Sequence, residues 1–217
     1  TATDYAGNSA TQNFAYSVSN LPEPVAPPST GGGVVSGVVA PASASSSILI
    51  PNAIIGREIN VSTLGVNSVI KEIIMEVKNQ SDNVNIKILE YNSKPYKDVV
   101  NVSEKTYKYI QINTTNLAEN LQTAILTFQV EKLWVSSRNL QKEDVVLSRF
   151  VPETGSWNEL NTTYKQEDET YYYYTAVLNH FSLFAISEKT KSIPEQIISE
   201  ITKSYGEASK HLITLII

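Results

Sequence analysis

Five Asn-x-Ser/Thr sequons are the residues of this chain whose types and spacing point to one definite chemistry. An asparagine followed two positions later by serine or threonine is an acceptor for N-linked sugar, and such sites occupy surface loops of secreted proteins. Roughly one or two sequons would arise by chance in a segment of this length, so five exceed the chance expectation. The alternative is that they occur by chance because the chain is rich in asparagine. We expect all five at strand ends or in exposed loops. The asparagines are Asn60, Asn79, Asn101, Asn113 and Asn161.

The other chemistry-bearing residues give little support to an enzyme. The chain has two histidines, His180 and His211, and no cysteine, so it has no thiolate nucleophile and no thiolate metal site. It contains no nucleophile elbow, phosphate loop, zinc-protease motif or dinucleotide fingerprint. We interpret His180 as a β-corner residue. The acidic run 167–169 could bind Ca²⁺ weakly, but it lacks the spacing of a calcium loop, so we interpret it as a solvated turn. We therefore predict no catalytic residue, no metal and no cofactor.

Composition narrows the class of partner. The chain has 217 residues, of which 41% are hydrophobic and 18% charged, and its formal net charge is −5. That length fits one or two domains with a proper core. A negative net charge argues against nucleic acid and anionic membrane surfaces as partners. The chain begins within a strand-like pattern and ends within an apolar run, so we expect it to be a segment of a longer protein.

The segment Tyr171–Ile186 is the element on which the rest of the predicted domain depends. Four consecutive tyrosines favour a strand over a helix. We predict a strand, a tight corner at Asn179-His180 and a second strand. Because side chains alternate along a strand, Tyr172, Tyr174, Ala176 and Leu178 should share one face. After this segment the pattern becomes charged and helical, so it closes the β domain.

The residues from Arg57 to Ile186 read as an all-β, immunoglobulin-like sandwich with a short helical insertion. Alternating apolar residues separated by turn signals are typical of that architecture. We expect a hairpin between 73–77 and 84–88, further strands at 107–112, 126–130, 145–150 and 157–160, and a helical turn at 132–140. The side chains expected in the core are Phe128, Trp134, Trp157 and Phe184.

Two segments precede that domain, which we place at 56–187. Residues 1–19 form a hairpin pattern around Gly7-Asn8, similar to the closing hairpin of immunoglobulin-like repeats in prokaryotic surface proteins. Residues 20–55 hold six of the nine prolines and four of the nine glycines, so we interpret them as a linker. The apolar stretches Val34–Val39 and Ile48–Ile50 are expected to lie against a sheet edge.

Residues 188–217 change to a helical period. Ser192 and Glu195 form a capping box around Pro194. A seam of apolar residues follows at steps of three and four, which is typical of an amphipathic helix. We expect this helix either to associate with the same helix of other chains or to form a stalk that begins a membrane anchor; the alternative is a helix docked on the sandwich. The seam residues are Ile198, Ile201, Tyr205, Ala208, Leu212 and Leu215.

The β segment resembles the PGF-pre-PGF domain of archaeal cell-surface proteins. The resemblance covers about residues 57–187 and rests on motifs that occur in the family's order. One motif departs: where members often carry Pro-Gly-Phe before the last strand, this chain has Asn179-His180-Phe181. The matching residues are Tyr107, Tyr109, Ile112, Leu126, Phe128, Val130, Trp134, Val145, Leu147, Trp157, Leu160, Tyr172, Tyr173, Tyr174, Phe181, Ser182, Phe184, Ala185 and Ile186.

The resemblance implies a secreted archaeal envelope glycoprotein with this domain near its membrane-proximal C-terminal end. We therefore expect a non-catalytic structural module, in a surface layer or a filament, located outside the cell. Its expected partners are other copies of itself or other envelope proteins, N-linked glycans, and a membrane reached through the terminal helix. The alternative is an adhesin or carbohydrate-binding module. Three or more exposed, coplanar aromatic side chains in one groove would favour that alternative.

Overall fold

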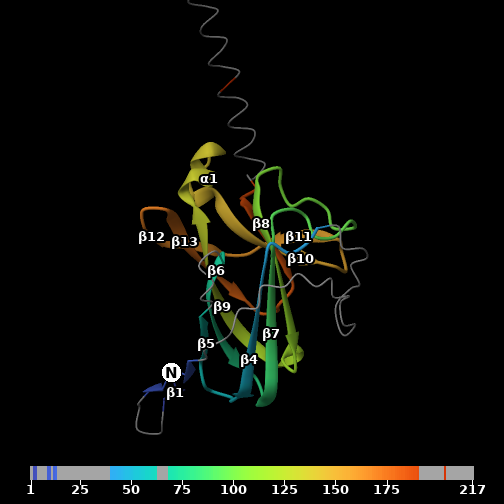
Figure 1. Ribbon diagram of the computed structural model, residues 1–217, viewed down its shortest axis with the longest axis vertical. Coiled ribbons are helices and arrows are strands. Elements are labelled where there is room, and N and C mark those ends of the chain that lie inside the picture. The colour runs from blue at the N-terminus through green and yellow to red at the C-terminus, as the bar shows by residue number, and fades with distance from the viewer. Residues whose placement is uncertain are drawn as a thin grey trace, which may run out of the picture.

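The computed structural model describes residues 2–3, 9–10, 12–13, 40–62, 68–190 and 203. Its main body is a sandwich of two six-stranded, largely antiparallel sheets with one short α-helix (Figure 1). The predicted all-β sandwich with a short helical insertion is therefore confirmed. Residues 1, 4–8, 11, 14–39, 63–67, 191–202 and 204–217 lie outside the described residues. They include most of the predicted linker and the predicted terminal helix.

Each sheet draws its strands from distant parts of the chain. The first sheet has the order β11 (Ser156–Glu159), β10 (Val145–Val151), β14 (Leu183–Glu188), β8 (Thr106–Thr115), β7 (Ser81–Tyr91) and β4 (Ala44–Ala53). The second has β12 (Thr162–Glu167), β13 (Tyr171–Leu178), β9 (Leu121–Glu131), β6 (Ile70–Val77), β5 (Ile59–Ser62) and β3 (Gln12–Asn13). Strands β1 (Ala2–Thr3) and β2 (Ser9–Ala10) pair antiparallel with each other, and the predicted turn at Gly7-Asn8 lies outside the described residues.

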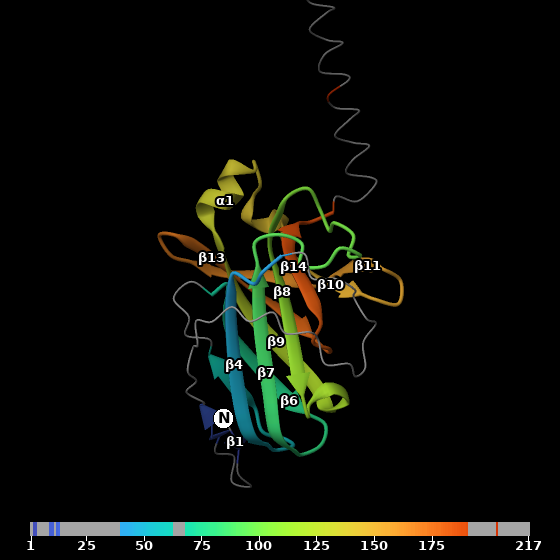
Figure 2. The ribbon, with the colours of Figure 1, turned by 45° about the vertical axis from the view of Figure 1, so that its right-hand side comes forward.

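Alternation along the strands builds the core between the sheets. In β6, Ile73, Met75 and Val77 are buried while Ile74 and Glu76 are half-buried, as predicted. The predicted face of β13 also points inward, because Tyr174 and two smaller neighbours are buried and Tyr172 packs against the core. Figure 2 shows β9 and β6 of the second sheet behind β4, β7 and β8 of the first. Burying apolar surface of this kind stabilises a fold by about 25 cal/mol per Å², so these alternating positions decide the architecture.

The predicted hairpin between 73–77 and 84–88 is wrong. Its two strands, β6 and β7, form in the expected places but belong to different sheets. The connection between them crosses from one sheet to the other, and the Lys78 N–H donates to the Asn120 carbonyl at 2.7 Å. Strands β13 and β14 are separated in the same way at the predicted corner. Period-2 alternation is identical for a hairpin and for such a crossing, so the pattern could not distinguish them.

Three strands of the two sheets, β4, β5 and β12, lie where no strand was predicted. Strand β4 falls inside the predicted linker, yet Ile48 and Ile50 are buried and β4 pairs antiparallel with β7. The sandwich therefore begins before residue 56, and the expectation that Ile48–Ile50 lies against a sheet edge is confirmed. Strand β12 is mostly polar and pairs with β13. An edge strand with exposed side chains carries little apolar alternation, so it gives a weak sequence signal.

A second hydrophobic cluster covers the outer face of the first sheet. It contains Tyr91, Tyr109 and Phe150 and is covered by the β7–β8 connection, residues 92–105, through Val99 and Val102. Trp157 packs against this outer cluster and not in the central core, which corrects its predicted place. Trp134, on α1 (Lys132–Ser137), is half-buried at the margin of the core, 5.1 Å from the Tyr107 ring. Phe128 and Phe184 are fully buried, as expected.

The start of β4 and the end of β14 lie at the same end of the sandwich. Ser43, just before β4, donates its N–H to the Glu90 carbonyl at the end of β7, and Glu188, ending β14, donates to Lys105 at the start of β8. Helix α1 lies at the same end (Figure 1). The β6–β7 and β8–β9 connections and the corner at His180 lie at the opposite end. The sandwich thus projects away from the end at which its last strand, β14, finishes.

Candidate functional site

The structure places the five sequon asparagines in two kinds of surroundings. Asn79, Asn101 and Asn161 are exposed in connections between strands. Asn60 and Asn113 are half-buried within β5 and β8, so their predicted placement in exposed loops is corrected. Both strands have neighbours on each side. The five sites are therefore not equivalent as acceptors of a bulky sugar.

The amides of the two strand asparagines are engaged with neighbours. The Asn60 Nδ2 donates to Glu72 Oε1 at 2.7 Å across the outer face of the second sheet. The Asn113 Oδ1 accepts from Gln111 Nε2 at 2.9 Å within β8. A sugar on either nitrogen would have to stand on a sheet face among these contacts. Among the described residues, the exposed Asn101 and Asn161 have no side-chain hydrogen bond of this kind.

Asn79 belongs to an amide network at the end of the sandwich away from α1. Its Nδ2 donates to Asn120 Oδ1 at 3.1 Å, and Asn120 Nδ2 donates to Ser81 Oγ at 2.9 Å. These contacts join the β6–β7 and β8–β9 connections around an open polar hollow of about 500 Å³. Asp82 and Glu119 are the acidic residues that line it. Hydrogen bonds within the loops account for the arrangement, and the hollow carries no catalytic constellation.

The acidic run 167–169 forms the turn between β12 and β13, as interpreted from the sequence. Asp168 Oδ1 accepts from the N–H groups of Thr170 and Tyr171 at 2.8 and 2.7 Å. Its Oδ2 accepts from the Tyr173 hydroxyl at 2.5 Å. The hydrogen bonds that Asp168 accepts from Tyr173 and from the two N–H groups lower the pKa of Asp168. The hydrogen bond between Tyr173 and Asp168 also raises the pKa of Tyr173 to about 12. The carboxylate therefore closes the turn.

An aromatic group joins the β12–β13 edge to the core. The Phe128 and Tyr174 rings stack with centroids 5.4 Å apart, and the Tyr164 ring meets Tyr174 edge-on at 6.0 Å. The Lys142 ammonium lies 4.2 Å from the Tyr164 centroid, a cation–π contact. Burial raises the pKa of Tyr174, whose hydroxyl donates to the Lys142 carbonyl at 2.9 Å. Phe128 and Tyr174 are buried and Tyr164 is half-buried beneath the Lys142 ammonium, so the group does not present an open aromatic platform.

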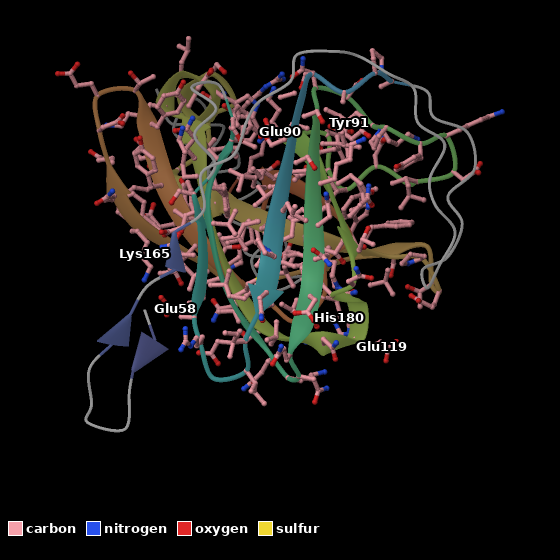
Figure 3. All side chains as sticks on the ribbon, turned by 60° about the horizontal axis from the view of Figure 1, so that its bottom comes forward. Glu58, Glu90, Tyr91, Glu119, Lys165 and His180 are labelled. Atoms are coloured by element: carbon pink, nitrogen blue, oxygen red, sulfur yellow. The ribbon has the colours of Figure 1, made fainter. Side chains whose placement is uncertain are left out.

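A buried carboxylate at Glu90 is the polar feature that sequence reasoning missed. Glu90 lies at the α1 end of β7, next to Tyr91 and far from His180 and Glu119 (Figure 3). Its side chain is only 2% exposed. It accepts from Ser68 Oγ at 2.5 Å and from the Val69 N–H at 3.0 Å. The signal was its register: Glu90 follows Ile88 by two positions and so occupies the inner face of β7.

The comparisons with known proteins give no family for this chain. No protein-family model matches it, and a search of curated proteins finds no match.

Within 40–62 and 68–190, no three His, Cys, Asp or Glu side chains gather as a metal site would require. No helix among the described residues is long and apolar enough to cross a membrane. His180 is exposed at the corner after β13, with Nδ1 3.2 Å from Asn179 Oδ1.

Proposed function

We propose that this chain is a non-catalytic structural module of an archaeal cell-surface glycoprotein, in a surface layer or a filament. It belongs near the membrane-proximal end of that protein, and its sandwich is of the immunoglobulin-like kind. One observation carries the proposal. Every aromatic side chain among residues 40–62 and 68–190 is buried or half-buried. Aromatic area placed inside a domain stabilises it, whereas a carbohydrate-binding groove needs rings on its surface.

The aromatic contacts support a structural role over the adhesin or carbohydrate-binding alternative. Tyr107 packs on Trp134 at one end of the core, and Phe150 packs on Trp157 at 5.2 Å in the outer cluster. The Trp157 indole N–H donates to the Val100 carbonyl at 2.9 Å, so this ring fastens a connection. The rings thus hold segments of the domain to one another. No groove lined by three exposed, coplanar rings occurs among the described residues.

The positions of the chain connections also fit a surface module. The chain leaves the last strand of the sandwich, β14, at Glu188, at the α1 end, where Ser43 also precedes β4. If the released chain leads toward the membrane, the Asn79 end of the domain points away from it. A chain without cysteine must be held together by packing alone, and the two hydrophobic clusters supply that packing.

Fractionation of native cells combined with intact-mass measurement tests this proposal. We expect the protein in the envelope fraction, with a mass above that of its own unmodified polypeptide. Limited protease treatment of intact cells should remove it, because the module lies outside the membrane. Recovery of the unmodified protein from the cytosolic fraction, protected from protease, would refute the surface role.

A further inference from the structure

The four edges of the two sheets differ in how they are protected from pairing with another chain. An edge strand presents unpaired N–H and C=O groups, and proteins protect such edges by shortness, charge or bulges. Strand β11 has four residues and β3 has two. Strand β12 carries Lys165 and Glu167, and its register shifts between Tyr164 and Gln166. Three of the four edges are therefore short, charged or irregular.

Strand β4 has few of these protections. It has ten residues, none of them charged, and pairs regularly with β7 from Ala44 to Ile50. Among the described residues no strand lies on its other side. Its outer face presents Ser47 and Leu49 to solvent, and Leu49 is 55% exposed. Its one protective residue, Pro51, lies between Ile50 and Asn52, and the same register with β7 continues on both sides of it. The segment Ala44–Ile50 is thus a long, neutral, regular edge.

We propose that β4 is an interface at which a second copy of this chain pairs, antiparallel and about a two-fold axis. In such a pair the residue at the axis faces itself, and a charged residue there would repel its own copy. The uncharged sequence of β4 meets that requirement. The proposal concerns this edge alone and does not depend on where the protein is located.

The register follows from the face that each side chain occupies and from Pro51. Pairing centred on Ser47 uses Ala44–Ile50 and stops before the proline, which has no N–H to donate. Because a two-fold axis perpendicular to the sheet preserves the two faces, Leu49 lies opposite Ser45 of the second copy on the outer face. Ile48 lies opposite its Ser46 on the inner face. The two first sheets would then join into one continuous sheet.

Cross-linking at Ser47 tests the register directly, because the chain has no cysteine of its own. Residues that face each other across antiparallel strands have Cβ atoms about 4.5–5.5 Å apart, close to the about 3.5–4.5 Å of a disulfide. In the full chain, Ser47→Cys should give a disulfide-linked dimer under mild oxidation. Asn158→Cys, exposed on β11, the opposite edge strand of the same sheet, is the matched control and should stay mostly monomeric.

A charge introduced at position 47 tests how strongly the two copies associate. Ser47→Lys should weaken self-association, measured by sedimentation, at least about fivefold, because the two new ammonium groups face each other. Asn158→Lys adds the same charge at an exposed position on β11, the other edge of the same sheet, and should leave association unchanged. Ser47 is exposed, so neither variant should alter the circular dichroism spectrum. Equal cross-linking at both cysteines, equal weakening by both lysines, or a wild-type chain that is monomeric at every concentration would each overturn the proposal.

Discussion

The Ser68 hydroxyl donates to the Glu90 carboxylate at 2.5 Å and ties the two sheets together. Glu90 belongs to β7 of the first sheet, while Ser68 leads into β6 of the second. Gln129 of β9 donates its Nε2 to the Ser68 carbonyl at 3.1 Å and its N–H to the Val69 carbonyl at 2.8 Å. A buried carboxylate is tolerated only when its oxygens are hydrogen-bonded. The tie therefore fixes how the sheets meet at the α1 end.

Removing the hydroxyl should destabilise the domain. Ser68→Ala takes one donor from a carboxylate that is only 2% exposed, and a buried acceptor left short of a partner costs about 1–3 kcal/mol. The free energy of unfolding, measured by urea denaturation, should fall by that amount. Ser93→Ala, at an exposed position, is the control and should change it by less than about 0.5 kcal/mol. Equal values for the two variants would remove Ser68 from the tie.

The central core should respond more strongly to a large truncation. Phe184→Ala empties a fully buried site in β14 and should lower the free energy of unfolding by about 3–5 kcal/mol. Val177→Ala changes a side chain that is 60% exposed on β13 and should cost less than about 0.5 kcal/mol. A loss below about 1 kcal/mol for Phe184→Ala would mean that the site collapses around the cavity.

Local patterns predicted the elements of this fold better than their connections. The inward face of β13 and the position of α1 follow from side chains two to four residues apart, and both are observed. The separation of β6 from β7 depends on contacts such as Lys78 with Asn120, which lie far apart in the sequence. No short pattern records such a pairing. The same holds for Glu90, whose partners lie more than 20 residues away.

The two tryptophans show that local patterns also fail to place some side chains that were expected in the core. Both were expected in the core because large aromatic side chains are usually buried. Trp157 is covered instead on the outer face by the β7–β8 connection. Because the outer face of a sheet is ordinarily polar, the alternation of apolar residues predicts a single core between the two sheets. A second cluster on the outer face forms only where another segment covers it. Here that segment is residues 92–105, which contain few apolar residues and so do not indicate their covering role in the sequence.

The indole hydrogen bond to Val100 should hold that covering segment in place. Trp157→Phe keeps a ring in the outer cluster but removes the donor to the Val100 carbonyl. The loss of about 0.5–1.5 kcal/mol should speed amide hydrogen exchange in residues 92–105 by about two- to tenfold. Trp134→Phe, which contacts Tyr107 at the core margin, should leave exchange there unchanged. Unaltered exchange in the Trp157 variant would show that packing alone retains the segment.

Stability should decline at alkaline pH partly through Tyr107. Burial, together with the nearby Glu131 carboxylate, raises the pKa of Tyr107 to about 12, against about 10 in an unfolded chain. Because the pKa of Tyr107 is higher in the folded protein than in the unfolded chain, its protonated hydroxyl contributes fully to the free energy of unfolding below the unfolded pKa. This contribution is lost as the pH rises toward the folded pKa. Urea midpoints should therefore fall between about pH 10 and 12, and fall less in Tyr107→Phe. Parallel pH profiles for the two proteins would contradict this role.

Glycan occupancy should follow the surroundings of the five sequons. In native protein we expect sugar on at least two of them, with Asn101 and Asn161 preferred, because both are exposed and carry no competing side-chain hydrogen bond among the described residues. Asn60 and Asn113 should be the least occupied, since they are half-buried in strands that are paired on both sides. Peptide mapping before and after deglycosylation measures each site. Asn101→Gln and Asn161→Gln should each remove one glycan mass, whereas Asn113→Gln should remove none. High occupancy at Asn60 and Asn113 with none at Asn101 and Asn161 would show that the folded surface does not govern the choice of site.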